Sequence, residues 1–314
     1  MAKKRSPTAD YAVYLAVRFV VMVIQGMPER WALSCGNILA WLVYQVDKRH
    51  REVARDNLRH AFPELCADPV ECDRIVRATY RHFCVMFIEM ILLPRKFKLT
   101  NWSLRLRCLD TRSYVGALTE TNRPTMVVTG HFGNWEIASY AMGAFGFPSS
   151  AIARALDNPY LDAYFRKFRE RTGQTVLCKN GDFDKITKVL ETNGALCTLG
   201  DQDAGPRGLF VEFFNRPAST HKAVALMALE YRPLMVVLGT ARVNKPWGYE
   251  VHVEDVIDPN DYADRRDAVE AITIRYTKAL ERLIRKFPEQ YFWLHRRWKH
   301  QPVQRAAKAK SQAA

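Results

Sequence analysis

Residues 124–136, PTMVVTGHFGNWE, predict a buried strand that runs through a glycine-containing turn into a helix. The apolar, β-branched run at 126–128 is typical of a strand covered on both faces. Residues 135–144 are helical in pattern, and Asn134 is placed to cap their first turn. In α/β proteins the carboxyl ends of strands open a crevice, and free helix N–H groups there favour negative charge. The stretch therefore predicts the position of a functional site.

Two ionisable side chains lie at the mouth of this turn. His131 lies between Gly130 and Gly133, and Glu136 lies three residues after Gly133. A histidine with a carboxylate partner can act as a general base, because the carboxylate fixes the tautomer and supports the imidazolium. A purely structural pair is the alternative interpretation. No Ser or Cys nucleophile and no second histidine at metal-ligand spacing accompanies the pair. We therefore expect a base that acts directly on a substrate hydroxyl, and no metal site.

Length and charge narrow the class of protein. The 314 residues can form one large or two modest domains. The net charge of +14 indicates an anionic partner, such as phospholipid headgroups, a phosphorylated glycolipid or an acidic carrier protein, although a solubilising surface is the alternative. The basic residues are dispersed and no DNA or RNA motif is present, so we expect no nucleic acid. The seven cysteines are scattered without CxxC pairs, which predicts reduced thiols in a cytosolic body.

Residues 1–46 are predicted to associate with a membrane. Two apolar stretches, 11–27 and 31–46, lie between basic flanks, and Arg18 interrupts the first. No small-residue cleavage site follows, so a removable signal peptide is not expected. We expect one spanning helix of borderline length or two helices lying partly in one leaflet, with a buried helical hairpin as the alternative. Four aromatic side chains suit the headgroup boundary: Tyr14, Tyr44, Trp31 and Trp41.

Residues 47–300 are predicted to form an α/β domain with a mostly parallel central sheet flanked by helices, and residues 301–314 a basic disordered tail. No GxGxxG, GxxxxGK[ST] or GxSxG motif supports a nucleotide-binding or α/β-hydrolase protein. Strands are expected at residues 104–108, 126–129, 150–154, 175–178, 195–199, 209–214, 234–241 and 249–253. Helices are expected at residues 48–63, 68–93, 113–120, 135–144, 160–172, 183–191, 221–231 and 263–287.

Three blocks of sequence, in this order, resemble one family. HFGNWE within TGHFGNWE (129–136) fits the H-x4-[DE] signature of glycerolipid-type acyltransferases. Together with DQDAGPRGLFVEFFNRPASTHKAVALMAL (201–229) and PEQYFWLHRRWK (288–299), it resembles the bacterial lipid A biosynthesis (late, Kdo-dependent) acyltransferase family, whose relatives include mycobacterial phosphatidylinositol mannoside acyltransferases. NLRHAFPE (57–64) also looks like a family pattern. Asn215 departs from the family, in which a glycine is usual at this position.

The resemblance implies a membrane-associated enzyme at the cytoplasmic face of the inner membrane. It implies transfer of a fatty acyl chain from an acyl carrier protein or coenzyme A thioester to a lipid hydroxyl, with no cofactor beyond that co-substrate. Lipid A precursor is the favoured acceptor, and another glycolipid such as a phosphatidylinositol mannoside is the alternative. A non-catalytic basic membrane-binding protein and a thioesterase or lipid hydrolase are the competing classes. We expect a monomer.

The resemblance also assigns roles to residues. His131 matches the catalytic base of the family, and Glu136 matches its charge-relay partner. Arg154 matches a basic position that would bind the oxyanion or a substrate phosphate, with a surface arginine before a loop as the alternative. Asp201 would position Arg154 or the acceptor, with a loop-turn aspartate as the alternative.

Several neighbouring residues are given supporting roles or none. Gly133 and Asn134 are expected to provide close backbone approach and helix capping. Arg169 and Arg171 could bind an anionic headgroup or carrier, but a solvated helix face is favoured for them. Glu89 is placed at a helix edge and is left out of the site.

Overall fold

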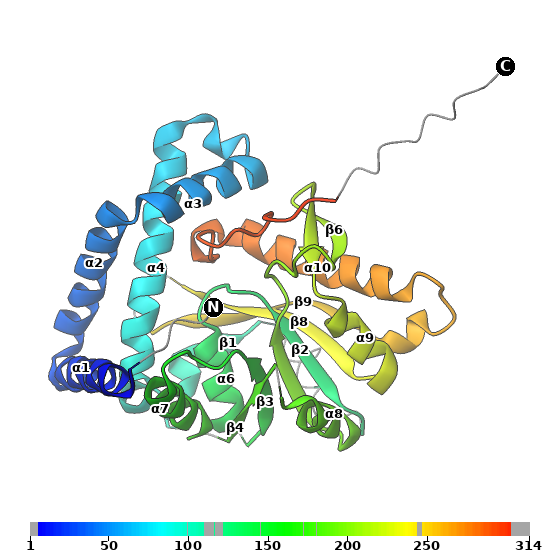
Figure 1. The fold of residues 1–314 in the computed structure, drawn as a ribbon, viewed down its shortest axis with the longest axis horizontal. Coiled ribbons are helices and arrows are strands. Elements are labelled where there is room, and N and C mark those ends of the chain that lie inside the picture. The colour runs from blue at the N-terminus through cyan, green and yellow to red at the C-terminus, as the bar shows by residue number, and fades with distance from the viewer. Residues whose placement is uncertain are drawn as a thin grey trace.

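The fold is described by a computed structural model over residues 6–98, 100–109, 116, 122–144, 146–171, 173–179, 181–243 and 247–302. Its centre is a seven-stranded sheet in the order β1-β9-β8-β2-β5-β3-β4 (Figure 1). The predicted α/β class, with a mostly parallel central sheet flanked by helices, is confirmed. The strands of this sheet are β1 (Leu106–Cys108), β2 (Thr125–Thr129), β3 (Ser149–Ala153), β4 (Gln174–Cys178), β5 (Ala195–Leu199), β8 (Leu234–Arg242) and β9 (Tyr249–Ile257).

Strand β2 lies near the middle of the sheet, with parallel partners on both sides. It pairs with β5 in the register Thr129↔Leu199 and with β8 in the register Val128↔Val237. The sheet continues in parallel through β3 to β4, whereas β9 runs antiparallel to β8. The carboxyl ends of β2, β3, β4, β5 and β8 therefore meet along one edge.

Helices cover both faces of the sheet, and the alternation along β2 shows how. Val127 packs with Ile137 of α6, while Met126 and Val128 face the opposite way and pack with helices α8, α9 and α10. Both faces are therefore buried, as the continuous apolar run predicts. The helices of the chain are α1 (Pro7–Gly26), α2 (Glu29–Val46), α3 (Lys48–Ala61), α4 (Pro69–Lys96), α6 (Trp135–Ala144), α7 (Pro159–Glu170), α8 (Phe183–Glu191), α9 (Lys222–Tyr231) and α10 (Ala268–Lys286).

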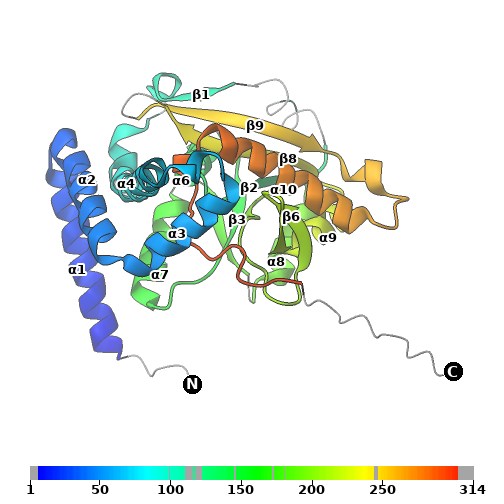
Figure 2. The ribbon, with the colours of Figure 1, turned by 90° about the horizontal axis from the view of Figure 1, so that it is seen from above.

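The first two helices form an outer layer beside the sheet. In Figure 1, α2 and α4 run side by side, and α1 is seen nearly end-on beside their lower ends. Figure 2 shows α1 and α2 at the margin of the molecule, with α4 between α2 and the sheet. Ile24 of α1 and Ala32 of α2 pack into the same core as Leu92 of α4. Helix α1 is the single described helix that is long and apolar enough to cross a membrane by length and composition.

Some element boundaries differ from the sequence predictions. Helix α4 continues through Pro94 to Lys96. Pro94 lies in the last turn, where it removes only one helical hydrogen bond, and the Phe97 N–H still donates to the Leu93 carbonyl. The last long helix begins at Ala268 instead of residue 263. The helix expected at 113–120 and most of the tail at 301–314 lie outside the described residues.

A β-hairpin separate from the central sheet follows β5. Its strands are β6 (Leu209–Phe213) and β7 (Arg216–Thr220), although the sequence predicted a strand only for the first. The two-residue turn, Phe214 and Asn215, has positive φ at both positions (51° and 58°). Asparagine tolerates this conformation better than most residues, which explains how Asn215 can replace the usual glycine.

Candidate active site

His131 and Asp201 are brought together by the pairing of β2 with β5. Thr129 and Leu199 are partners in the sheet, and each of the two polar residues follows its strand by the same two positions. His131 Nδ1 lies 2.9 Å from Asp201 Oδ1, and the His131 backbone N–H donates to Asp201 Oδ2 at 2.8 Å. Both oxygens of one carboxylate therefore hold one histidine.

This contact sets the charge and tautomer of the imidazole. Asp201 is fully buried, and although burial raises its pKa, the charge and hydrogen bonds of His131 hold that pKa below its usual range. Burial lowers the pKa of His131, but the charge of Asp201 and its hydrogen bond outweigh that effect and raise the pKa above its ordinary value. The ionised Asp201 accepts a hydrogen bond from the Nδ1–H of the neutral imidazole, so the free lone pair is on Nε2. Gln202 Nε2 lies 3.4 Å from this nitrogen.

Glu136 does not take the place that the family resemblance assigns to it. Its carboxylate forms a two-point ion pair with Arg169 of α7, at 2.5 and 3.1 Å, and accepts from Trp135 Nε1. The carboxylate that contacts His131 is that of Asp201, which was expected to position Arg154 or the acceptor. The sequence pattern could not show which carboxylate, that of Glu136 or that of Asp201, contacts His131, because the contact depends on the pairing of β2 with β5. Arg169 is likewise half-buried against Glu136 instead of lying on a solvated face.

Gly133 and Asn134 wedge the turn against β8. Gly133 has a positive φ of 56°, and a Cβ there would lie 1.9 Å from the Thr240 carbonyl oxygen, so only glycine fits. Its N–H donates to the Gln290 carbonyl, and the Asn134 N–H donates to the Thr240 carbonyl, each at 2.8 Å. Asn134 Oδ1 accepts from the Ile137 N–H at 3.2 Å and caps α6.

A second layer of buried polar residues supports the turn, and the sequence analysis missed it. Glu89 was placed at a helix edge, but it is 1% exposed and forms a two-point ion pair with Arg242. Asn134 Nδ2 also donates to Glu89, at 3.2 Å. His82 Nε2 lies 3.0 Å from the Gly133 carbonyl oxygen; burial, then the charge of Arg242, lower the pKa of His82 to about 3, so it is neutral. A carboxylate within the apolar stretch of α4 was the available signal.

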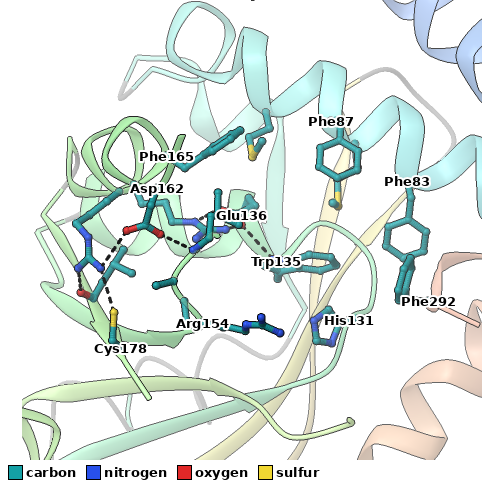
Figure 3. A pocket seen from close by; sticks show the side chains of 18 residues that line it. Phe83, Phe87, His131, Trp135, Glu136, Arg154, Asp162, Phe165, Cys178 and Phe292 are labelled. Atoms are coloured by element: carbon teal, nitrogen blue, oxygen red, sulfur yellow. Dashed lines mark hydrogen bonds and ion pairs between the residues drawn. The ribbon is translucent and has the colours of Figure 1, made fainter. Parts of the chain in front are cut away.

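His131 opens onto an apolar cavity of about 390 Å³, which we call the His131 cavity (Figure 3). Its imidazole packs edge-on against Trp135, at 5.3 Å between ring centroids, and lies tilted against Phe292, at 6.2 Å. Phe83 and Phe87 of α4 form one wall. The surface of the cavity is mostly apolar, although Glu136, Asp162, Arg154, Arg166 and Arg169 also border it. Such a lining suits a hydrocarbon chain whose polar end lies beside His131.

Arg154 lies at the rim of this cavity, at the end of β3. Its side chain is 87% exposed, forms an exposed ion pair with Asp157 at 3.2 Å, and extends in the direction of His131 in Figure 3. It is therefore placed to meet an anionic group at the cavity mouth. Asp201 has its described contacts with His131 and not with Arg154.

A further cavity, of about 530 Å³, lies between α6 and the sheet. Trp135 lines both this α6 cavity and the His131 cavity, and a narrow space of about 90 Å³ beside Glu136 and Arg169 borders both. The lining of the α6 cavity is mostly apolar, with Val127, Leu238 and others from the strands beneath it. Trp135, in contact with His131, therefore lies between two mostly apolar spaces.

Among the described residues, no group of three or more His, Cys, Asp or Glu side chains is arranged to hold a metal ion. In this arrangement His131 Nε2 can accept a proton from a group that lies in the His131 cavity.

Comparisons with known proteins agree with this chemistry. The family model described as bacterial lipid A biosynthesis acyltransferase matches residues 2–300. Lipid A biosynthesis palmitoleoyltransferase of Escherichia coli K12 is 25% identical over 261 residues, covering 82% of this chain and 81% of that protein. Lipid A biosynthesis lauroyltransferase of the same organism is 24% identical over 297 residues, covering 93% and 92%.

Two more distant similarities complete the picture. Phosphatidylinositol mannoside acyltransferase of Mycolicibacterium smegmatis is 23% identical over 280 residues, covering 88% of each chain. Among solved structures, the 1-acyl-sn-glycerophosphate acyltransferase of Thermotoga maritima aligns with a TM-score of 0.35 and 11% identity, covering 79% of this chain and 95% of that one.

Proposed function

Because this chain belongs to the bacterial lipid A biosynthesis acyltransferase family and is an acyltransferase, we propose that it transfers a fatty acyl chain from a carrier-protein or coenzyme A thioester to a hydroxyl of lipid A precursor. The observation that carries the mechanism is the His131–Asp201 pair at the end of an apolar cavity. The relatives named for lipid A favour that acceptor, and the relative named for phosphatidylinositol mannoside keeps a second glycolipid open.

In the proposed reaction His131 Nε2 takes the proton of the acceptor hydroxyl as its oxygen attacks the thioester carbonyl carbon. Asp201 stays ionised, holds the ring by its Nδ1–H, and offsets the charge of the imidazolium. The tetrahedral intermediate then collapses: the carbon–sulfur bond breaks, and the leaving thiolate takes the proton from Nε2. The products are an ester and a free thiol, and the base is restored.

The oxyanion needs donors that are not already engaged. The backbone N–H groups of His131, Gly133 and Asn134 are used within the fold, by Asp201 and the carbonyls of Gln290 and Thr240. At the start of α6 the N–H groups of Trp135 and Glu136 have no partner within the helix, whereas that of Ile137 donates to Asn134. The exposed guanidinium of Arg154 lies at the rim. We assign the oxyanion to the N-terminus of α6 and the acceptor phosphate to Arg154.

The α6 cavity suits the acyl chain of the donor. It meets the His131 cavity at Trp135 and its walls are mostly apolar, so a chain threaded past Trp135 would place its thioester near Nε2. The donor brings a single chain, which an enclosed cavity can hold. An acyl carrier protein is the favoured donor over coenzyme A because the net charge of +14 suits an acidic carrier.

Membrane association is favoured by the outward faces of α1 and α2. Large apolar side chains there are exposed, among them Trp31 at 71% and Trp41 at 61%. Arg18, which interrupts the apolar run, turns towards the protein: it donates to Tyr14 and lies 5.1 Å from the Tyr164 ring of α7. This favours two helices lying on one leaflet, at the cytoplasmic face of the inner membrane, over a single spanning helix. The protein would act there as a monomer.

The test is a transfer assay with purified protein. A radiolabelled acyl carrier protein thioester and a coenzyme A thioester are each offered with lipid A precursor, with phosphatidylinositol mannoside, or with no acceptor. We expect labelled acylated lipid A precursor and little free fatty acid. Free fatty acid as the sole product would show that the protein acts as a hydrolase and not as a transferase. A labelled product formed only with phosphatidylinositol mannoside would show that lipid A precursor is not the acceptor.

A further inference from the structure

A third apolar cavity lies against the His131 cavity, in the angle between α1, α4 and α7. It has a volume of about 280 Å³, and we call it the α1 cavity. Phe87, Met90 and Phe165 line it and the His131 cavity alike, so these side chains form the partition between the two. The full lining of the α1 cavity is apolar: Ala16, Val17, Val20, Val21, Phe87, Met90, Ile91 and Phe165.

The α1 cavity reaches the surface of the protein that carries the exposed apolar residues. Val20 is 52% exposed and Phe87 is 54% exposed, although both line the cavity. The preceding residue, Phe19, is exposed as well. Apolar side chains therefore form a path from the outer face of α1 as far as Phe87, Met90 and Phe165, the partition that separates the α1 cavity from the His131 cavity. In water such a path is unfavourable, and hydrocarbon would cover it.

Helix α1 is held at its two ends, and the α1 cavity lies between them. Near the start, Asn158 Nδ2 donates to the Asp10 carbonyl at 2.8 Å, and Tyr11 packs on Tyr160 of α7. Near the end, Gln25 Nε2 donates to the Ile91 carbonyl of α4 at 3.2 Å. Between these ends Val17, Val20 and Val21 line the cavity, and Arg18 lies over the Tyr164 ring of α7. The helix thus bridges α7 and α4 with a gap beneath its middle turns.

We propose that this gap is a lateral portal, through which one hydrocarbon chain of the membrane-embedded acceptor lipid passes from the leaflet into the His131 cavity. The inference rests on the proposed function and adds the route of the acceptor. A lipid with several chains is not lifted out of the bilayer, because each exposed methylene costs free energy. A thioester on a soluble carrier has no need of a path through the α1–α2 layer, so the portal serves the acceptor and not the donor.

Photocrosslinking tests the portal without requiring turnover. The probe is phosphatidylglycerol with a diazirine at the end of one acyl chain, incorporated into phosphatidylethanolamine–phosphatidylglycerol vesicles with the full chain. Mass spectrometry is expected to find adducts on the α4 peptide with Phe87 and Met90, on Phe165, and on Trp135. Adducts confined to outer residues such as Phe19 and Trp41 would overturn the portal.

A matched pair of variants sharpens the test. Ala16 lines the α1 cavity, and Ala12, one turn earlier on the same helix, does not. Ala16→Trp is expected to reduce the adducts on Phe165 and Trp135 by at least about tenfold, because the added ring fills the gap. Ala12→Trp adds the same ring outside the cavity and should leave them unchanged. Equal adduct yields for the two variants would remove the portal, and thermal melts of both check folding.

Transfer to two forms of the acceptor separates this inference from the proposed function. With lipid A precursor in vesicles, Ala16→Trp should lose at least about tenfold in rate, since misplacing a substrate is costly. With a short-chain, water-soluble analogue of the same acceptor it should match the parent protein. Equal losses with both acceptors would overturn the portal but not the enzyme. A parent protein that acylates neither would overturn the proposed function, while the crosslinks would still decide the portal.

Discussion

The carboxyl edge of the central sheet and the α1–α2 layer differ in the side chains that they bury and expose. At the sheet edge, buried charges are paired within the chain: Asp201 with His131, and Glu89 with Arg242. In the α1–α2 layer, large apolar side chains such as Trp31 and Trp41 are left exposed. Buried charges need partners and exposed apolar surface needs a cover. The first region is therefore complete in itself, whereas the second calls for a membrane.

The largest expected effect comes from removing His131, the proposed general base at the carboxyl edge of the sheet. His131→Ala should lower acyl transfer by about 10²–10⁴-fold, the usual range for loss of a general base. The initial rate of labelled product measures it, and a melting curve checks that the fold survives. His50→Ala, on the exposed surface of α3, is the matched control and should behave as the parent does. Normal turnover without His131 would remove the mechanism.

The next effect distinguishes the two carboxylates near the base. Asp201→Asn should lower kcat on the order of a hundredfold, because an amide cannot support the imidazolium and favours the wrong tautomer. Glu136→Gln should cost less, since Glu136 bonds to Arg169 and Trp135 and not to the imidazole. The comparison is made on kcat at saturating donor. If Glu136→Gln proved the more damaging change, Asp201 would lose its assigned role.

The pH dependence follows from the same contact. The pKa of His131 is raised by Asp201 despite burial, so the protonated form, which cannot act as a base, persists to higher pH than for an ordinary histidine. kcat/KM should rise with pH, by about tenfold per unit below the pKa, and level off above a midpoint higher than about 6.5. In Asp201→Asn this midpoint should fall. An identical midpoint in both proteins would contradict the pairing.

The smallest expected effect addresses the α1–α2 layer. Trp31→Glu combined with Trp41→Glu should weaken binding to anionic vesicles by at least about tenfold. Full burial of one such side chain contributes roughly 1.5–3 kcal/mol and every 1.4 kcal/mol is tenfold, but side chains at the headgroup boundary are buried only in part. Vesicle co-sedimentation measures it. Leu226→Glu, at an exposed apolar position on α9, is the control. If the control weakened binding as much, the membrane-facing surface would have to be reassigned.

Much of the fold could be predicted because the signals are local. The apolar run of β2, the glycine turn and the pattern of α6 are adjacent in sequence, and the strand–helix alternation indicated a mostly parallel sheet. The end of α4 was predicted three residues early, since a proline breaks a helix less in its final turn than in its interior. Strand β7 was missed because Pro217 argues against a strand, yet proline is tolerated in a two-stranded hairpin.

The candidate site was predicted in part, and the limit is physical. The position of His131 after a buried strand was readable, and so was the position of Asp201 after another. Which carboxylate meets the imidazole depends on β2 and β5 being neighbours in register, and that pairing joins residues 70 positions apart. The Glu89–Arg242 pair depends in the same way on α4 packing beside β8.

By itself, the sequence determined that HFGNWE follows a buried strand, that the first 46 residues are apolar between basic flanks, and that the chain belongs to an acyltransferase family. Periodicity and motif are properties of short segments, so they survive without coordinates. Only the tertiary structure decided that Asp201 contacts His131, that Glu136 pairs with Arg169, and that the His131 cavity borders both the α6 cavity and the α1 cavity. Those facts depend on contacts between distant segments, which exist only once the sheet is assembled.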